Sequence, residues 1–370
     1  MAQGKLGFGF MRLPVIDGVQ ENIDMEQLNK MVDEFLGNGF TYFDTSYAYH
    51  NGKSEEALRK SVVERYPREQ FTIATKLPTF LIQTEDQVED IFAQQLKNLG
   101  TDYVDYYLLH AMMEGGYKKY DKFHLWDFVG EQKAKGLVKH MGFSFHAGPQ
   151  LLDRLLKEHP EVDFVQLQIN YADWENPSVT ARANYEVARK HGKSIVVMEP
   201  VKGGNLANPP AAVKRMFDEY HPDMSYASWA IRFVASLDGI ITVLSGMSNT
   251  QQMEDNLSYM KKFQPLNEAE QKIIQEAQRI LGNSSTIPCT ACHYCTEGCP
   301  KKIPIPEIFS AMNKQLGNGQ MAEAASDYRK ATSLTGKASE CINCRQCERI
   351  CPQHLGITGY LKQCADAMET

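Results

Sequence analysis

Up to Leu244, short apolar runs along the chain alternate with longer stretches in which apolar residues recur at helical spacing. The short runs are rich in β-branched and aromatic residues, which favours buried strands. They lie at residues 6–10, 40–43, 71–74, 103–109, 137–143, 164–169, 195–198 and 240–244. We therefore predict eight strands separated by helices.

The first helical stretch illustrates the pattern. Asp24 is placed to cap a helix, and Gln27 lies three residues further on, as in a capping box. The predicted apolar face consists of Leu28, Met31, Val32 and Phe35. Further helices are predicted at residues 55–64, 86–99, 122–135, 149–157, 179–190, 213–233, 250–261 and 267–281.

Strands alternating with helices in this way are typical of an α/β protein with a (β/α)8 TIM barrel. A doubly wound open sheet is the alternative. Such sheets often carry a Gly-x-Gly-x-x-Gly turn after a strand. The nearest match, Gly-Phe-Gly at residues 7–9, lacks the third glycine and a following helix. We therefore predict the barrel.

The chain divides into three predicted parts. The barrel is expected at residues 1–265 and a connecting helix at 266–282. The segment Gly-Asn-Ser-Ser at 282–285 is typical of a boundary. Residues 283–370 are predicted to form a small, mostly helical domain, because helical periodicity runs through 306–315.

Charge and hydropathy exclude several partners. The chain has 39 Lys and Arg against 46 Asp and Glu, a net charge of -7, and no basic run longer than a Lys-Lys pair. This composition argues against nucleic acid or an anionic membrane as a partner. No segment approaches the roughly 18 apolar residues of a membrane helix, and the start of the sequence lacks the pattern of an export signal. A cytoplasmic protein is expected.

All nine cysteines lie between Cys289 and Cys364, and eight of them repeat one motif. The pattern C-x2-C-x2-C-x3-C-P occurs twice, formed by Cys289, Cys292, Cys295 and Cys299, and by Cys341, Cys344, Cys347 and Cys351. This spacing is typical of two 4Fe-4S clusters, in which the fourth cysteine of each motif binds the other motif's cluster. We therefore pair Cys299 with the second motif and Cys351 with the first.

Paired zinc sites are the alternative, but they usually use two separated cysteine pairs for each metal. The helical pattern between the motifs resembles the helical type of dicluster ferredoxin. Cys364 belongs to neither motif and is expected to be a small buried apolar residue.

The predicted barrel carries polar residues where its strands end, which is where barrel enzymes place their chemistry. These residues are Asp44, Lys76, His110, Ser144 and Asn170, with Tyr49 in the loop after Asp44. A lysine cation held by an aspartate would stabilise a tyrosine phenolate and make the phenol a usable acid. Four of these residues also have a structural explanation when each is taken alone. These are a surface carboxylate for Asp44, loop packing for Tyr49, a rim ion pair for Lys76 and a hydrogen-bonded core histidine for His110.

Four segments carry a resemblance to a known family: residues 43–49 (Phe-Asp-Thr-Ser-Tyr-Ala-Tyr), 74–76 (Ala-Thr-Lys), 108–110 (Leu-Leu-His) and 142–144 (Gly-Phe-Ser). They resemble the aldo/keto reductases over about residues 5–262. With its cysteine motifs, the chain is similar to the ferredoxin-tailed branch of that family in anaerobic bacteria. The resemblance implies that Tyr49 is the general acid, that Lys76 and Asp44 tune it, and that His110 orients the carbonyl.

The resemblance also implies that Ser144 and Gln166 hold a nicotinamide carboxamide. Family members that prefer NADPH carry a lysine and an arginine where this chain has Gly246 and Gln252, while Asn256 is retained. Glu199 stands where an aromatic residue usually stacks on the nicotinamide. The nucleotide therefore stays open between NADH, weakly bound NADPH, flavin mononucleotide and none. Backbone amides at 203–204 and 245–248 can still bind a phosphate.

Electron counting bears on function. A 4Fe-4S cluster passes one electron and a nicotinamide passes two as hydride, so direct exchange between them is unfavourable. We predict a reductase of a small carbonyl or related unsaturated substrate, with two 4Fe-4S clusters relaying electrons and a ferredoxin or flavodoxin as redox partner. The alternatives are an NAD(P)H-dependent enzyme whose clusters are structural or redox-sensing, and a non-catalytic electron-transfer or regulatory protein.

Overall fold

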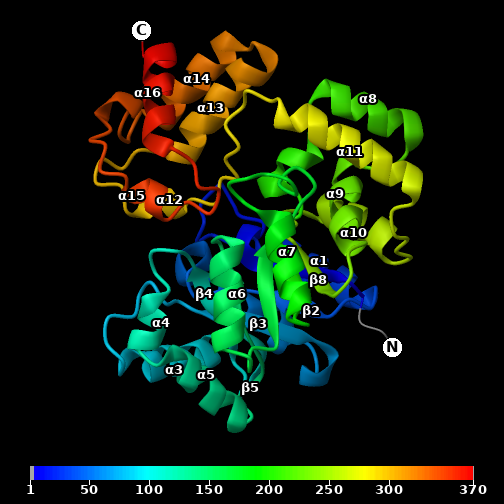
Figure 1. Cartoon of the computed structure of the whole chain (residues 1–370), viewed down its shortest axis with the longest axis vertical. Helices are drawn as coiled ribbons and strands as arrows, with labels where there is room; N and C mark the ends of the chain where they lie inside the picture. Colours follow the sequence, from blue (N-terminus) through cyan, green and yellow to red (C-terminus); the bar gives the residue numbers. More distant parts are fainter. Residues whose placement is uncertain (1–3, 370) are drawn as a thin grey trace.

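Eight parallel strands close into a barrel in the computed structural model, which describes residues 4–369 (Figure 1). Each strand pairs with the next along the chain, and the last pairs with the first. The strands are β1 (Leu6–Gly9), β2 (Tyr42–Asp44), β3 (Thr72–Leu77), β4 (Val104–Met112), β5 (Val138–Phe145), β6 (Phe164–Gln168), β7 (Ser194–Met198) and β8 (Ile240–Ser245). The predicted (β/α)8 fold is confirmed.

Helices surround the barrel and join its strands (Figure 1). They are α1 (Met25–Gly37), α2 (Ser54–Leu58), α3 (Gln87–Leu99), α4 (Lys118–Lys122), α5 (Leu125–Ala134), α6 (Pro149–Glu158), α7 (Ala181–Lys190), α8 (Ala211–Tyr220), α9 (Tyr226–Ala235) and α10 (Thr250–Met260). The single helix predicted at 213–233 is wrong: α8 and α9 are separate. Pro222 lies between them, and proline disfavours helical conformation in the residue before it.

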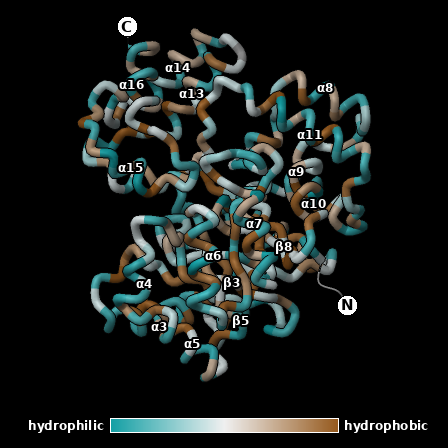
Figure 2. Tube along the Cα trace, in the orientation of Figure 1, coloured by the Kyte–Doolittle hydropathy of each residue, from teal (hydrophilic) through white to brown (hydrophobic). Residues whose placement is uncertain are grey.

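Side chains alternate across each strand, and this alternation places the polar residues. An apolar layer fills the inside of the barrel, formed by Tyr42, Ala74, Leu108, Phe164, Val196 and Leu244. Two residues further along their strands, Asp44, Lys76 and His110 therefore point inward at the carboxyl end. The strands themselves are largely apolar (Figure 2).

Helix α11 (Glu268–Gly282) follows the barrel and packs beside α8 and α9. Asn267 and Glu270 form a capping box at its start. Arg232 of α9 donates to both Glu270 oxygens, at 2.7 and 3.1 Å, which fixes α11 against the barrel.

Residues 283–369, hereafter the tail, form a second, helical unit with its own core (Figure 1). Its helices are α12 (Tyr294–Glu297), α13 (Ile305–Asn318), α14 (Met321–Ala331), α15 (Gln346–Arg349) and α16 (Ile357–Met368). The described part of the tail contains no strand, as predicted. None of the helices within residues 4–369 is long and apolar enough to span a bilayer.

Candidate active site and cysteine sites

Lys76 and Asp44 form a buried ion pair at the carboxyl end of the barrel. The ammonium group donates to Asp44 Oδ1 at 2.7 Å, to Asp44 Oδ2 at 2.9 Å and to the Thr45 carbonyl at 2.7 Å. Burial lowers the pKa of Lys76 and raises that of Asp44, while their mutual attraction opposes both shifts. The pair therefore fixes a cation beside Tyr49, and the hydrogen bonds of this cation are already made to Asp44 and Thr45.

Tyr49 lies beside this pair, with Lys76 Nζ 4.9 Å from the centre of its ring. Burial, reinforced by the Asp44 carboxylate, raises the pKa of the Tyr49 phenol well above 10. The expectation that Lys76 would lower this pKa is wrong, because Asp44 and Thr45 already ligate the ammonium group. The phenol therefore holds its proton at neutral pH.

His110 completes the group, with its ring centre 6.2 Å from that of Tyr49. Its Nδ1 lies 3.3 Å from Ser46 Oγ. Burial, helped by the Lys76 charge, lowers the pKa of His110 well below 6.5. A neutral imidazole can orient a polar group without adding charge to the site. Asn170, also predicted at a strand end, instead binds Asp173 at 2.8 Å and the Glu199 carbonyl at 3.1 Å.

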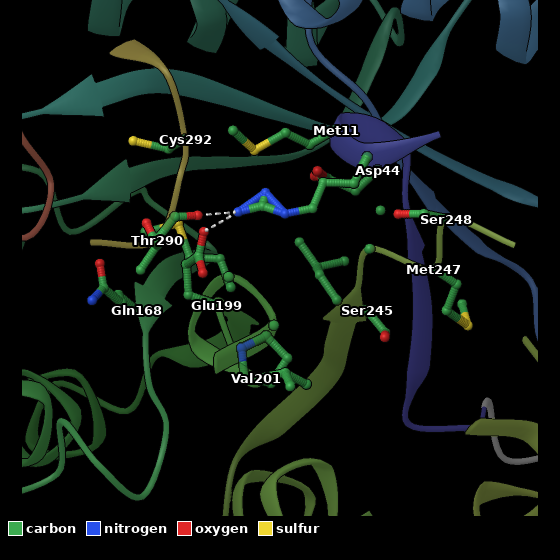
Figure 3. Close-up of a pocket in the computed structure, with 18 of the residues that line it drawn as sticks. Met11, Asp44, Gln168, Glu199, Val201, Ser245, Met247, Ser248, Thr290 and Cys292 are labelled. Carbon is green, nitrogen blue, oxygen red and sulfur yellow. Dashed lines mark hydrogen bonds and ion pairs between the residues drawn. The ribbon is translucent and has the colours of Figure 1, made fainter. Parts of the chain in front are cut away.

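Asp44, Tyr49 and His110 line a cavity of about 490 Å³ (Figure 3), and the residues predicted for the nucleotide line it as well. Ser144, Gln166, Gly246 and Asn256 all line it. Ser144 Oγ accepts a hydrogen bond from the Ala111 amide at 2.8 Å. Gln166 Oε1 and Asn256 Oδ1 are buried without a partner. Free amide oxygens of this kind fit a ligand that donates N–H groups, such as a carboxamide.

Arg12 is a cation of the cavity that the sequence argument missed. It follows β1 and donates to the Thr290 carbonyl at 2.8 Å and to Glu199 at 3.4 Å, the two dashed contacts of Figure 3. Its stem covers Gly246, where an added Cβ would meet it at 3.5 Å. Barrel enzymes place their chemistry where strands end, and a search just after the first strand would have indicated Arg12.

The tail closes one side of the cavity. Thr290, Cys292, Tyr294, Pro352 and Gln353 line it together with the barrel residues. The side chain of Tyr294 hydrogen-bonds with that of Tyr49. Gly203 comes so close that an added Cβ would lie 2.3 Å from the Thr290 carbonyl oxygen. Nothing in the local sequence around Tyr294 indicates this position, since it depends on how the tail docks.

The eight motif cysteines form two groups in the tail. Cys289, Cys292, Cys295 and Cys351 surround one space, the first cysteine site. Cys299, Cys341, Cys344 and Cys347 surround another, the second cysteine site. The structure thus brings together the crossed sets that the motif spacing predicts. Cys364 is fully buried in α16, apart from both.

The donor sets suit clusters better than single metal ions. Among residues 4–369, no three His, Cys, Asp or Glu side chains converge on one ion position. A zinc ion draws four ligands to one centre, whereas a cubane binds each cysteine at a different iron and so keeps the sulfurs apart. The four-cysteine spaces therefore fit 4Fe-4S clusters.

An eight-stranded barrel with this site and a two-site cysteine tail defines an iron–sulfur oxidoreductase. The family model described as "Aldo/keto reductase family" matches residues 5–279, and that described as "4Fe-4S dicluster domain" matches residues 288–355. The chain therefore belongs to the aldo/keto reductase family, whose enzymes are oxidoreductases.

The relatives match the barrel. An aldo-keto reductase of Mycolicibacterium vanbaalenii is 29% identical over 250 residues, which cover 66% of this chain and 82% of that protein. The uncharacterized oxidoreductase YqkF of Bacillus subtilis is 22% identical over 283 residues, 68% of this chain and 86% of that protein. The holo form of aldo-keto reductase AKR11C1 from Bacillus halodurans superposes with a TM-score of 0.58 at 23% identity, covering 74% and 91% of the two chains, a likeness of fold.

Proposed function

We propose that this protein reduces a small carbonyl or related unsaturated substrate in the barrel cavity, with two 4Fe-4S clusters relaying electrons to it. One observation carries the proposal. Thr290, Cys292, Pro352 and Gln353 line both the catalytic cavity and the first cysteine site. The wall between the two is therefore a single layer of residues, which supports electron transfer from one to the other.

In this proposal, Tyr49 donates its proton to the oxygen atom that is being reduced. Its phenol is protonated at neutral pH and half-buried, so it faces the cavity with the proton in place. Neutral His110 orients the same oxygen. The Lys76–Asp44 pair positions the phenol, since the Lys76 ammonium group lies 4.9 Å from the centre of the Tyr49 ring and is itself held by Asp44.

The residues present fit both implied cofactors. The crossed cysteine sets would hold the clusters, which supply one-electron transfer when bound. Ser144, Gln166 and Asn256 would hold a nicotinamide nucleotide, and flavin mononucleotide is the alternative. Arg12 is the cation available to a phosphate or to an anionic substrate in this cavity.

A second candidate is an NAD(P)H-dependent reductase whose clusters are structural or redox-sensing. The unpaired oxygen of Gln166 favours it, since an amide oxygen suits a carboxamide ligand, and the unpaired oxygen of Asn256 is free to accept from another part of the nucleotide. Both candidates use the same acid group and differ in the source of electrons.

Turnover under strict anaerobiosis separates them. The protein would be purified without oxygen and given benzaldehyde with either reduced methyl viologen or NAD(P)H as the sole reductant. The relay predicts formation of the alcohol with viologen alone, with two viologens oxidised and two protons taken up for each carbonyl reduced. Turnover that requires NAD(P)H and ignores viologen would favour the second candidate.

A further inference from the structure

The two cysteine sites differ in their access to solvent. The first lies between the tail and the barrel, and Cys295 and Cys351 are each 7% exposed. The second lies on the outer surface of the tail, where residues 342–346, including Cys344, are all exposed. Electrons that come from another protein therefore have their shortest entry at the second site.

The rim of the second site is apolar at its centre. Ile342 lies between Cys341 and Cys344 and is 56% exposed, a large fraction for an isoleucine. Lys301 and Arg345 line the same small space as Ile342. An apolar contact ringed by cations is the usual composition of a docking face for an acidic protein.

The side chains around this rim carry a small excess of positive charge, in a chain whose net charge is -7. A 4Fe-4S cluster held by four thiolates adds about -2, so the attraction for an acidic partner comes from the exposed cations themselves. The two segments that carry the site, 297–302 and 337–349, contain the cations Lys301, Lys302, Lys337, Arg345 and Arg349 and the carboxylates Glu297, Glu340 and Glu348. Glu348 is engaged by Thr358, which donates to it at 2.7 Å, and lies 3.8 Å from Arg345. The guanidinium group of Arg345, with 68% of its side chain exposed, remains available to a partner.

We propose that the face formed by Lys301, Ile342, Cys344 and Arg345 docks a small acidic ferredoxin. In each encounter one electron leaves the ferredoxin's reduced cluster and enters the second cysteine site, which is reduced by that electron; no bond is made or broken. This inference rests on the proposed function, because it requires the second site to hold a redox-active cluster. It adds the docking surface and narrows the predicted redox partner, ferredoxin or flavodoxin, to a ferredoxin.

The exposed cations Lys301 and Arg345 would attract acidic groups of the ferredoxin and orient it toward Cys344. A cluster at the second site would occupy the space between its four cysteines, which leaves no room there for an organic substrate. A protein contact through Ile342 and Arg345 is the interaction that this surface supports.

The test measures binding as well as electron transfer. An acidic bacterial two-cluster ferredoxin would be titrated into the anaerobically purified protein by calorimetry, at several salt concentrations. Wild type should bind, with affinity that falls as salt rises. Arg345→Glu and Ile342→Asp should each weaken binding at least tenfold. Lys261→Glu, a charge change at an exposed residue just after α10 on the barrel, should leave it unchanged.

Iron content and reduction by methyl viologen would be measured on each variant and should match wild type, which shows that the tail is folded and its clusters are intact. Binding that is equal in wild type and Arg345→Glu, or that is seen with flavodoxin and not with ferredoxin, would overturn the docking proposal. If the variants lose ferredoxin binding but reduced viologen does not support turnover of the wild type, the docking surface is supported and the proposed electron relay is refuted.

Discussion

Tyr294, between two cysteines of the tail, hydrogen-bonds with Tyr49, the proposed general acid of the barrel. The contact joins residues 245 positions apart in sequence and links the first cysteine site to the proposed proton donor. The contact with the Tyr294 hydroxyl lowers the pKa of Tyr49, against the larger upward effect of burial. The tail thus contributes directly to the site where the substrate is expected to react.

Removing this hydroxyl should weaken catalysis without disturbing the tail. A single hydrogen bond contributes about 0.5–1.5 kcal/mol, so Tyr294→Phe should lower kcat roughly 2- to 13-fold while KM changes little. Tyr360→Phe is the matched control, since Tyr360 packs on Phe309 inside the tail, away from the barrel. Iron content of both variants should equal wild type. An unchanged kcat in Tyr294→Phe would show that the contact is structural only.

Loss of the acid itself should have a larger effect. Tyr49→Phe keeps the ring over Lys76 and removes the proton, so turnover of a carbonyl probe should fall about 100-fold or more. Circular dichroism and iron content should stay at wild-type values. Tyr47→Phe, two residues earlier in the same loop, serves as control and should retain activity. Full activity of Tyr49→Phe would exclude it as the general acid.

The barrel and its polar strand ends could be predicted because they depend on local pattern. Strand periodicity places Asp44, Lys76 and His110 on the inner face, and parallel strands bring their carboxyl ends together. The cysteine pairing could also be predicted, because motif spacing limits which thiolates reach one cluster.

The remaining features depend on contacts between distant segments. The position of Tyr294, the path of Arg12 to Thr290 and the enclosure of the cavity all follow from the docking of the tail on the barrel, which no local pattern encodes. The predicted direction of the Tyr49 pKa shift was wrong for a similar reason. Burial and the ligation of Lys76 by Asp44 depend on the whole three-dimensional surroundings.

The protonation states predict a flat pH profile. Burial and the Lys76 charge keep the pKa of His110 well below 6.5, and the pKa of Tyr49 lies well above 10. Neither group changes charge between pH 6 and about 9, so kcat for a carbonyl probe should vary by less than about twofold across that range. Stopped-flow measurement at saturating reductant would test this. A limb near pH 6.5 that disappears in His110→Asn would show that the imidazole titrates.

The crossed cysteine sets predict which substitutions act alike. Wild type purified without oxygen should contain about eight irons per chain, and replacing one ligand should remove about four. Cys289→Ala and Cys351→Ala should leave the same cluster, with identical electron paramagnetic resonance spectra after reduction. Cys299→Ala and Cys344→Ala should each leave only the cluster of the first cysteine site. Cys364→Ala should keep both. Spectra that group Cys299 with Cys289 would contradict the crossed pairing.

Gly203 lines the cavity beside the tail, and its substitution offers a way to loosen the tail without changing a cysteine or any of Asp44, Tyr49, Lys76 and His110. Its φ is +65°, and an added Cβ would lie 2.3 Å from the Thr290 carbonyl oxygen, so Gly203→Ala must push the tail away from the barrel. Gly204→Ala is the matched control: its φ of +98° brings a similar backbone penalty of about 1–2 kcal/mol, but nothing lies within 4 Å.

Both variants should therefore lose similar stability, and only Gly203→Ala should expose the segment before Cys289 to limited proteolysis. Displacement of the tail separates Tyr294 from Tyr49 and increases the distance between the first cysteine site and the cavity at Thr290. Gly203→Ala should therefore slow viologen-driven turnover by more than Tyr294→Phe does. Its iron content should stay near wild type. Equal proteolysis and equal turnover in the two alanine variants would mean that the close contact of Gly203 with Thr290 does not hold the tail in place.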